Sequence, residues 1–149
     1  MTLRTKKTIK IVLGLAVWLR FIFRNSLKNS VQSANQSEAA EGFLRRILSS
    51  LGFSGNAEAV AEIAVRKAAH IFEFFVLFLL LAALFALLIK SINVTVICSS
   101  ALAFGFACID ECLQIISHRG ASVRDVLIDS VGIAIGALLY VFVRKKRNR

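Results

Sequence analysis

Four apolar stretches alternate with polar and charged segments along the chain. They cover residues 9–23, 68–89, 94–116 and 126–143. A membrane-spanning helix needs about 20 mostly apolar residues, and the stretches lack the alternation that is typical of a half-buried strand. Because helices and closed barrels alone satisfy backbone groups in lipid, the pattern predicts an all-α polytopic membrane protein. We expect one domain, residues 1–149, built as a four-transmembrane-helix bundle.

The first stretch is short and is interrupted by Lys10 and Arg20. Its basic start and short apolar run also fit a cleaved signal peptide. Positive charge directly after the apolar run opposes export, and Arg20 and Arg24 lie there. We therefore expect a retained first helix, with a cleaved signal peptide as the alternative.

Composition supports a membrane location and indicates an orientation. The chain is 57% hydrophobic, above the roughly one half that is usual in soluble domains, and its mean hydropathy is +0.72. The net charge of +10 is concentrated in the two tails. Positive-inside bias then places both termini, and the loop with Lys90, on the cytoplasmic side of a bacterial cell membrane. The basic tail residues are Arg4, Lys6, Lys7, Lys10, Arg144, Lys145, Lys146, Arg147 and Arg149.

Basic tails beside a bilayer attract anionic lipid. This attraction accounts for the net charge without nucleic acid, so the bilayer is the expected partner and nucleic-acid binding is not predicted. The sequence gives no indication of the oligomeric state.

The long segment between the first two spans is predicted to lie outside the cell. Residues 25–37 are polar and serine-rich, which is typical of an exposed connection. Residues 37–51 have apolar positions at i, i+4 spacing, which predicts an amphipathic helix. Such a helix is too short to span, so we expect it in the outer headgroup layer or against the bundle as a lid. Residues 57–67 then begin a helix that continues into the second span.

Ionisable residues reach the outer end of three predicted helices. Spacings of three and four place Arg66, Lys67, His70 and Glu73 on one helix face. An ionised side chain in lipid is costly, so we expect these groups to face inward, pair with opposite charges and form an outward-facing polar pocket. The alternative is that the pairs only hold the helices in register. The predicted cluster contains Arg66, Lys67, His70, Glu73, Asp110, Glu111, Gln114, Arg119, Ser122, Asp125 and Asp129.

The three cysteines, Cys98, Cys108 and Cys112, all fall in the third span. A second cysteine pair that would complete a metal site is missing from the sequence. We expect buried thiols, and the sequence predicts no metal and no cofactor.

Three ordered motifs carry a family resemblance: RKAAHIFEF from Arg66, DECLQ from Asp110 and RGASVRDVLIDSVGIAIG from Arg119. They resemble the VanZ-like membrane proteins, a bacterial family named for a teicoplanin-resistance factor. The resemblance extends over about residues 9–143 and implies an effect on glycopeptide susceptibility at the cell surface. Asp129 departs from the family pattern, in which asparagine is expected.

The last motif also carries Gly132 and Gly136, one turn apart. Small residues at this spacing let two membrane helices pack closely. We expect a packing surface there, on the same helix face as Asp129.

The first functional hypothesis is an envelope protein whose outer pocket binds a lipid-linked cell-wall precursor or a glycopeptide-related surface ligand. Guanidinium groups match phosphate in geometry. Arg66, Lys67, Arg119 and Arg124 would hold the phosphate, and the acids would orient those cations. Binding of this kind would alter teicoplanin-type susceptibility.

The second hypothesis is an intramembrane hydrolase or transferase that acts on a lipid-linked substrate. His70 and Glu73 would be a general-base pair, and Glu111 a general acid. Ser122 is the candidate nucleophile. A metal held by His70, Glu73, Asp110 or Glu111 has no recognised ligand spacing in its favour.

The third hypothesis is a small proton-coupled carrier. Glu73 and Asp129 are its best residues, since they are the deepest acids. The inner half of every predicted helix is apolar, which argues against a path through the protein.

Overall fold

The computed structural model describes residues 2–27, 41–47, 49–50, 57–116 and 123–147. Within these residues every regular element is a helix, which confirms the all-α class. The four long helices are α1 (Leu3–Ser26), α3 (Ala57–Phe85), α4 (Ile92–Ile116) and α5 (Val123–Arg147).

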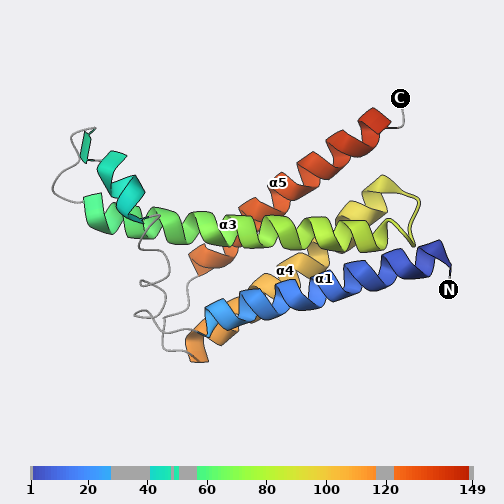
Figure 1. The fold of residues 1–149 in the computed structure, drawn as a ribbon, viewed down its shortest axis with the longest axis horizontal. Coiled ribbons are helices and arrows are strands. Elements are labelled where there is room, and N and C mark those ends of the chain that lie inside the picture. The colour runs from blue at the N-terminus through green and yellow to red at the C-terminus, as the bar shows by residue number, and fades with distance from the viewer. Residues whose placement is uncertain (1, 28–40, 48, 51–56, 117–122, 148–149) are drawn as a thin grey trace.

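Helix α3 is the centre of the bundle and packs against α1, α4 and α5. Figure 1 shows α1 running along α3, while α4 and α5 cross it obliquely. Both termini and the turn between α3 and α4 lie at one end of the molecule. The opposite end brings together the last turns of α1 and α4 and the first turns of α5.

The central role of α3 follows from its apolar face. Phe74, Leu77, Phe78 and Leu81 recur at spacings of three and four, and all four are buried. They pack with Leu15 and Ile22 of α1, Ala103 and Ala107 of α4, and Ile133 of α5.

Helix α4 approaches its neighbours through small side chains. Thr95, Ser99, Ala103 and Ala107 follow one another at intervals of four and are all buried. Lipid tails are as apolar as leucine, so association of membrane helices depends on close packing of this kind. The same face of α4 continues into Asp110 and Gln114, which are also buried. The expectation of buried thiols is wrong for Cys108 and Cys112 of this helix, which are exposed.

The predicted glycine packing surface is confirmed. A Cβ on Gly132 would lie closer to the Ile71 carbonyl oxygen of α3 than van der Waals contact permits. A Cβ on Gly136 would lie 2.8 Å from Cδ1 of Phe78. Glycine is therefore required at Gly132, where the obstacle is backbone that a rotamer change does not move.

Three helices of the described chain are long and apolar enough to cross a membrane: Val60–Phe85, Ile92–Ile116 and Val123–Arg147. They correspond to the second, third and fourth predicted spans. Helix α1 does not join them, because Lys10, Arg20 and Arg24 interrupt its apolar run. It packs along α3 and α4 all the same, and the first predicted span, residues 9–23, stays a prediction.

The segment before α3 is seen in part. Residues 41–47 and 49–50 are helical, in agreement with the amphipathic helix expected over 37–51, whose remaining residues lie outside the described ones. Its place in the headgroup layer stays a prediction. Helix α3 runs unbroken from Ala57 to Phe85, as expected for the stem before the second span.

One expectation about this segment is wrong. Residues 25–37 were expected to form an exposed connection, but α1 continues to Ser26, which is buried. Ser26 lies one turn after Ile22, so it stays on the packed face of α1 instead of entering a loop. Residues 28–37 lie outside the described part of the chain.

We predict that Gly132→Ala destabilises the bundle, because α5 must move away from the backbone of α3. Overpacking of this kind costs about 1–3 kcal/mol. Thermal unfolding of the purified protein in detergent measures the loss. Gly105→Ala on α4 is the matched control, since a Cβ there has nothing within 4 Å. Equal midpoints for the two variants would contradict the close approach of α5.

Candidate functional site

Four carboxylates are buried where the ends of the helices meet. Glu73 is 7% exposed, Asp110 0%, Glu111 7% and Asp129 1%. Two of them continue faces that also pack the bundle: Glu73 lies one turn before buried Leu77, and Asp110 lies three residues after Ala107 on the small-residue stripe of α4. The packing of the helices therefore carries the acids inward.

Asp110 is held by two hydrogen-bond donors. The Ser26 hydroxyl of α1 donates to its Oδ1. Gln114 Nε2, one turn further along α4, donates to its Oδ2 over 3.0 Å. Each carboxylate oxygen of this fully buried residue thus accepts one hydrogen bond, and the two bonds fix the orientation of the carboxylate.

Glu73 ties α3 to α1. Asn25 Nδ2 donates to Glu73 Oε1 over 2.9 Å, and Trp18 Nε1 donates to the Glu73 backbone carbonyl over 3.0 Å. The last turns of α1 therefore supply donors to two of the buried acids.

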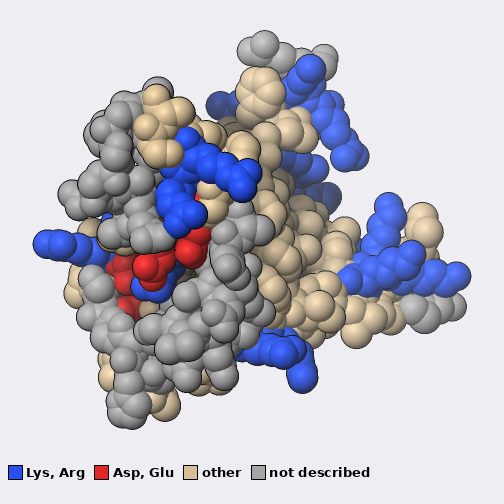
Figure 2. All heavy atoms as spheres, turned by 60° about the vertical axis from the view of Figure 1, so that its left-hand side comes forward, with Lys and Arg blue, Asp and Glu red and all other residues tan. Residues whose placement is uncertain are grey.

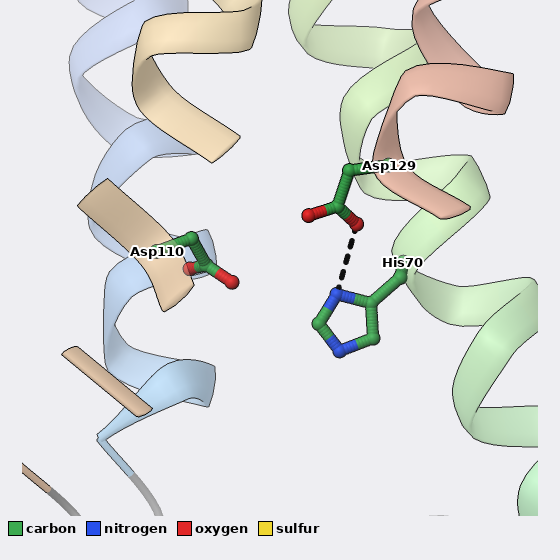
Figure 3. A group of neighbouring side chains, drawn as sticks. All are labelled: His70, Asp110 and Asp129. Carbon is green, nitrogen blue, oxygen red and sulfur yellow. Dashed lines mark ion pairs between the residues drawn. The ribbon is translucent and has the colours of Figure 1, made fainter. Parts of the chain in front are cut away.

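His70 and Asp129 lie face to face from α3 and α5. His70 Nδ1 is 3.2 Å from Asp129 Oδ1, yet neither atom forms a hydrogen bond of good geometry. Asp129 Oδ2 is also buried, and it has no hydrogen-bond partner among the described residues. Figure 3 shows both side chains, with Asp110 of α4, directed into one space between the three helices.

This space has the composition of a metal-binding site. His70, Asp110 and Asp129 each offer one ligand atom, and these atoms all lie within 4.8 Å of one another. Imidazole nitrogen and carboxylate oxygen are common ligands of divalent metals. The three residues come from three helices, so the sequence spacing did not reveal them as a set.

A pocket of about 200 Å³ lies between α3 and α5, beside this cluster. His70 belongs to both, since it lines the pocket as well as facing Asp129. Figure 2 shows acidic side chains gathered on this face, with Lys and Arg side chains next to them. The lining residues are Ile63, Arg66, Lys67, His70, Asp125 and Ile128.

The basic residues of the predicted cluster that the structure describes lie at the surface, whereas four of its acids are buried. Arg66 pairs with Glu62 of its own helix over 3.1 Å, and both side chains are about half exposed. This is the i, i+4 order that stabilises helices slightly. The charged side chains that are buried in the described chain are all Asp or Glu. The expected pairing of Arg66 with the inner acids is therefore not what the structure has.

Most of the predicted cluster lies at this end of the bundle. Arg66, Lys67, His70 and Asp125 line the pocket, while Glu73, Asp110, Glu111, Gln114 and Asp129 are buried. Arg119 and Ser122 lie outside the described residues.

Helix α1 contributes to the site in a way that was not predicted from the sequence. Trp18, Asn25 and Ser26 all contact the acidic residues or their backbone. Together with buried Ile22 they fall at spacings of three and four, on one face of α1. That spacing could have indicated a continuous helix face. It was overlooked because Asn25 and Ser26 are polar and were expected to belong to the following loop.

Comparison with known proteins places the chain in a family. The VanZ/LLP1 family model matches residues 11–144, so the chain belongs to the VanZ/LLP1 family. A similar protein is the uncharacterized membrane protein YwnJ of Bacillus subtilis (strain 168), which is 35% identical over 89 residues. That match covers 60% of this chain and 58% of the length of YwnJ. No solved structure matches the chain significantly.

We predict that Ser26→Ala destabilises the protein, because it removes a donor from the fully buried Asp110. An unsatisfied buried polar group costs about 1–3 kcal/mol. Thermal unfolding in detergent is again the measurement. Ser130→Ala is the matched control, since the Ser130 hydroxyl donates to Val126 within its own helix. Equal unfolding midpoints for Ser26→Ala and Ser130→Ala would show that α1 does not hold Asp110.

Proposed function

We propose that this member of the VanZ/LLP1 family is an envelope protein of the bacterial cytoplasmic membrane that binds the anionic headgroup of a lipid-linked ligand. The ligand would be a cell-wall precursor or a related surface molecule, bound in the pocket between α3 and α5. The observation that carries the proposal is the pocket lining, which combines two cations with two isoleucines.

The lining matches a molecule with a charged head and an apolar chain. Arg66 and Lys67 present exposed cationic groups on one turn of α3, and such groups bind phosphate. Ile63 and Ile128 add apolar surface to the same pocket, and Ile63 is 52% exposed. A soluble anion would use the cations alone, whereas a lipid-linked one would use both parts.

The orientation is part of the proposal. Both termini and the loop with Lys90 lie at one end of the bundle (Figure 1), and these carry the basic tails. Positive-inside bias favours the cytoplasm for that end. The pocket at the opposite end then faces outward, where a glycopeptide antibiotic also acts, so altered teicoplanin-type susceptibility would follow from binding there.

An intramembrane hydrolase or transferase is the second candidate, and one observation favours it. His70, the expected general base, both lines the pocket and faces Asp129 over 3.2 Å. A carboxylate beside a histidine orients the ring and stabilises its protonated form. The orienting partner of His70 would then be Asp129 and not Glu73, which accepts a hydrogen bond from Asn25.

We predict that Lys67→Gln weakens binding of a polyprenyl diphosphate, because it removes one cation from the pocket. Loss of about 1.4 kcal/mol corresponds to a tenfold weaker affinity. Binding is measured on the purified protein in nanodiscs of uncharged lipid. Lys90→Gln, at the opposite end of the bundle, is the matched control, because it has the same net charge as the Lys67→Gln variant.

Equal affinities of the two lysine variants would exclude this pocket as the headgroup site. Binding of inorganic diphosphate as tightly as the lipid form would leave no role for Ile63 and Ile128. Glycopeptide susceptibility is compared in cells with and without the gene. An unchanged value would remove the antibiotic part of the proposal and leave the lipid part.

We predict opposite accessibility at the two ends of the bundle, for Lys67 in α3 and Lys90 in the loop between α3 and α4. In a variant with Cys98, Cys108 and Cys112 replaced by alanine, a membrane-impermeant maleimide should label Lys67→Cys in intact cells and leave Lys90→Cys unlabelled. Both positions are exposed, so burial does not decide the result. Permeabilised cells should label both. Labelling of the Lys90 position alone in intact cells would invert the proposed orientation.

A further inference from the structure

We propose that His70, Asp110 and Asp129 bind a divalent cation of the first transition row, with Zn²⁺ as the preferred ion. The three ligand atoms come from α3, α4 and α5 and lie within 4.8 Å of one another. Figure 3 shows the three side chains directed into a common space. The site would join three helices of the bundle and does not depend on the proposed headgroup binding.

The charge of the cluster is the first argument. Asp110 and Asp129 are 0% and 1% exposed, and a protonated His70 beside Asp129 would balance only one of the two negative charges. Two buried carboxylates without a cation carry a large desolvation penalty and repel each other. No lysine or arginine is buried among the described residues. A divalent cation cancels both negative charges at the point where they converge.

Unsatisfied ligand atoms are the second and independent argument. Asp129 is almost fully buried, yet neither of its carboxylate oxygens has a hydrogen-bond partner among the described residues, and the same holds for His70 Nδ1. Buried polar atoms are normally paired. Figure 3 shows the second oxygen of Asp129 directed toward Asp110 and away from His70. A cation between the three side chains would bind one ligand atom of each, including an oxygen of Asp129.

The ligand set selects the class of ion. Ca²⁺ and Mg²⁺ prefer oxygen ligands alone, whereas imidazole together with carboxylate suits zinc and its neighbours. Tetrahedral zinc places its ligand atoms about 3.4 Å apart, since each lies about 2.0–2.2 Å from the metal. The three ligand atoms in the protein lie within 4.8 Å of one another, so they would approach by up to about 1.4 Å to reach tetrahedral coordination.

A second shell of hydrogen bonds already orients one ligand. Ser26 and Gln114 donate to the two oxygens of Asp110, and a carboxylate oxygen has a further lone pair for a metal. Partners of this kind commonly tune metal affinity by 10–100-fold. The three protein ligands leave a fourth position, and His70 places the site at the wall of the pocket. This open position is typical of zinc that binds a further ligand.

The test measures zinc binding to the full-length protein in detergent after removal of metals by chelation. Cys98, Cys108 and Cys112 are first replaced by alanine, because free thiols also bind zinc. We expect one Zn²⁺ per chain, by elemental analysis and by competition with a fluorescent chelator. Asp129→Asn should weaken binding at least about a hundredfold, beyond the range of a second-shell change. Mg²⁺ should not compete at equal concentration.

The matched controls are other acids at the same end of the bundle. Glu73→Gln changes a buried acid outside the three ligands, and Asp125→Asn changes an acid of the pocket lining. Both should keep one zinc per chain. Because Asp129→Asn alters a buried residue, its thermal unfolding is measured without metal. A folded variant that no longer gains stability from added Zn²⁺ supports the site.

Three outcomes would overturn the proposal. The first is a folded cysteine-free protein that binds far less than one zinc per chain. The second is an affinity of Asp129→Asn equal to that of the parent protein. The third is an equal loss in Glu73→Gln, which would indicate a general effect of buried charge. Cobalt absorption in the parent protein, lost in Asp129→Asn, would place the metal on this ligand set.

Discussion

Gly132 lets α5 lie directly against the backbone of α3 at Ile71. Ile71 follows His70, and Asp129 lies one turn before Gly132. The absence of a side chain at one position therefore determines how far the imidazole stands from the carboxylate, 3.2 Å in the structure. A larger residue would move α5 outward and carry Asp129 with it. The packing of α5 and the position of its buried carboxylate are thus coupled within one turn of helix, because Gly132 and Asp129 share a face.

Helix α1 has a different role in the same end of the bundle. It is less apolar than the other three long helices, yet its last turns donate hydrogen bonds to Glu73 and Asp110. Trp18 adds a bond to the backbone of α3 at the same level. Buried carboxylates are tolerated only where donors meet them. Helix α1 supplies such donors, so its retention in the mature protein is consistent with the structure of the acid cluster.

The sequence was sufficient to predict the fold class, the second to fourth spans and the glycine packing surface. These features depend on local periodicity and on residue size, which are visible along a single segment. The end of α1 was missed because Asn25 and Ser26 resemble loop residues in composition, and only their spacing from Ile22 marks them as part of a helix face.

The sequence predicted which residues gather at this end of the bundle, but it did not predict which of their side chains lie close together. The three side chains His70, Asp110 and Asp129 converge only because α3, α4 and α5 meet at particular rotations, which periodicity does not specify. The expected charge pairing also failed for Arg66. A salt bridge to Glu62 on the same helix is available without desolvation, whereas pairing with a buried acid would require both groups to leave water.

Exposed cations and buried carboxylates at this end of the bundle would both affect the affinity for an anionic ligand. The cations of the pocket, Arg66 and Lys67, are exposed, while Asp110 and Asp129 lie buried behind His70. Screening by water weakens the attraction of exposed cations, but buried carboxylates act at close range through a medium of low dielectric. An anionic headgroup in the pocket would therefore be repelled from within as well as attracted from outside. Neutralising the two inner carboxylates with one divalent cation removes that repulsion. The two ligand classes proposed for this end of the bundle are for that reason mutually reinforcing: a cation bound within would strengthen the binding of an anion outside, and by linkage the anion would strengthen the binding of the cation by the same factor.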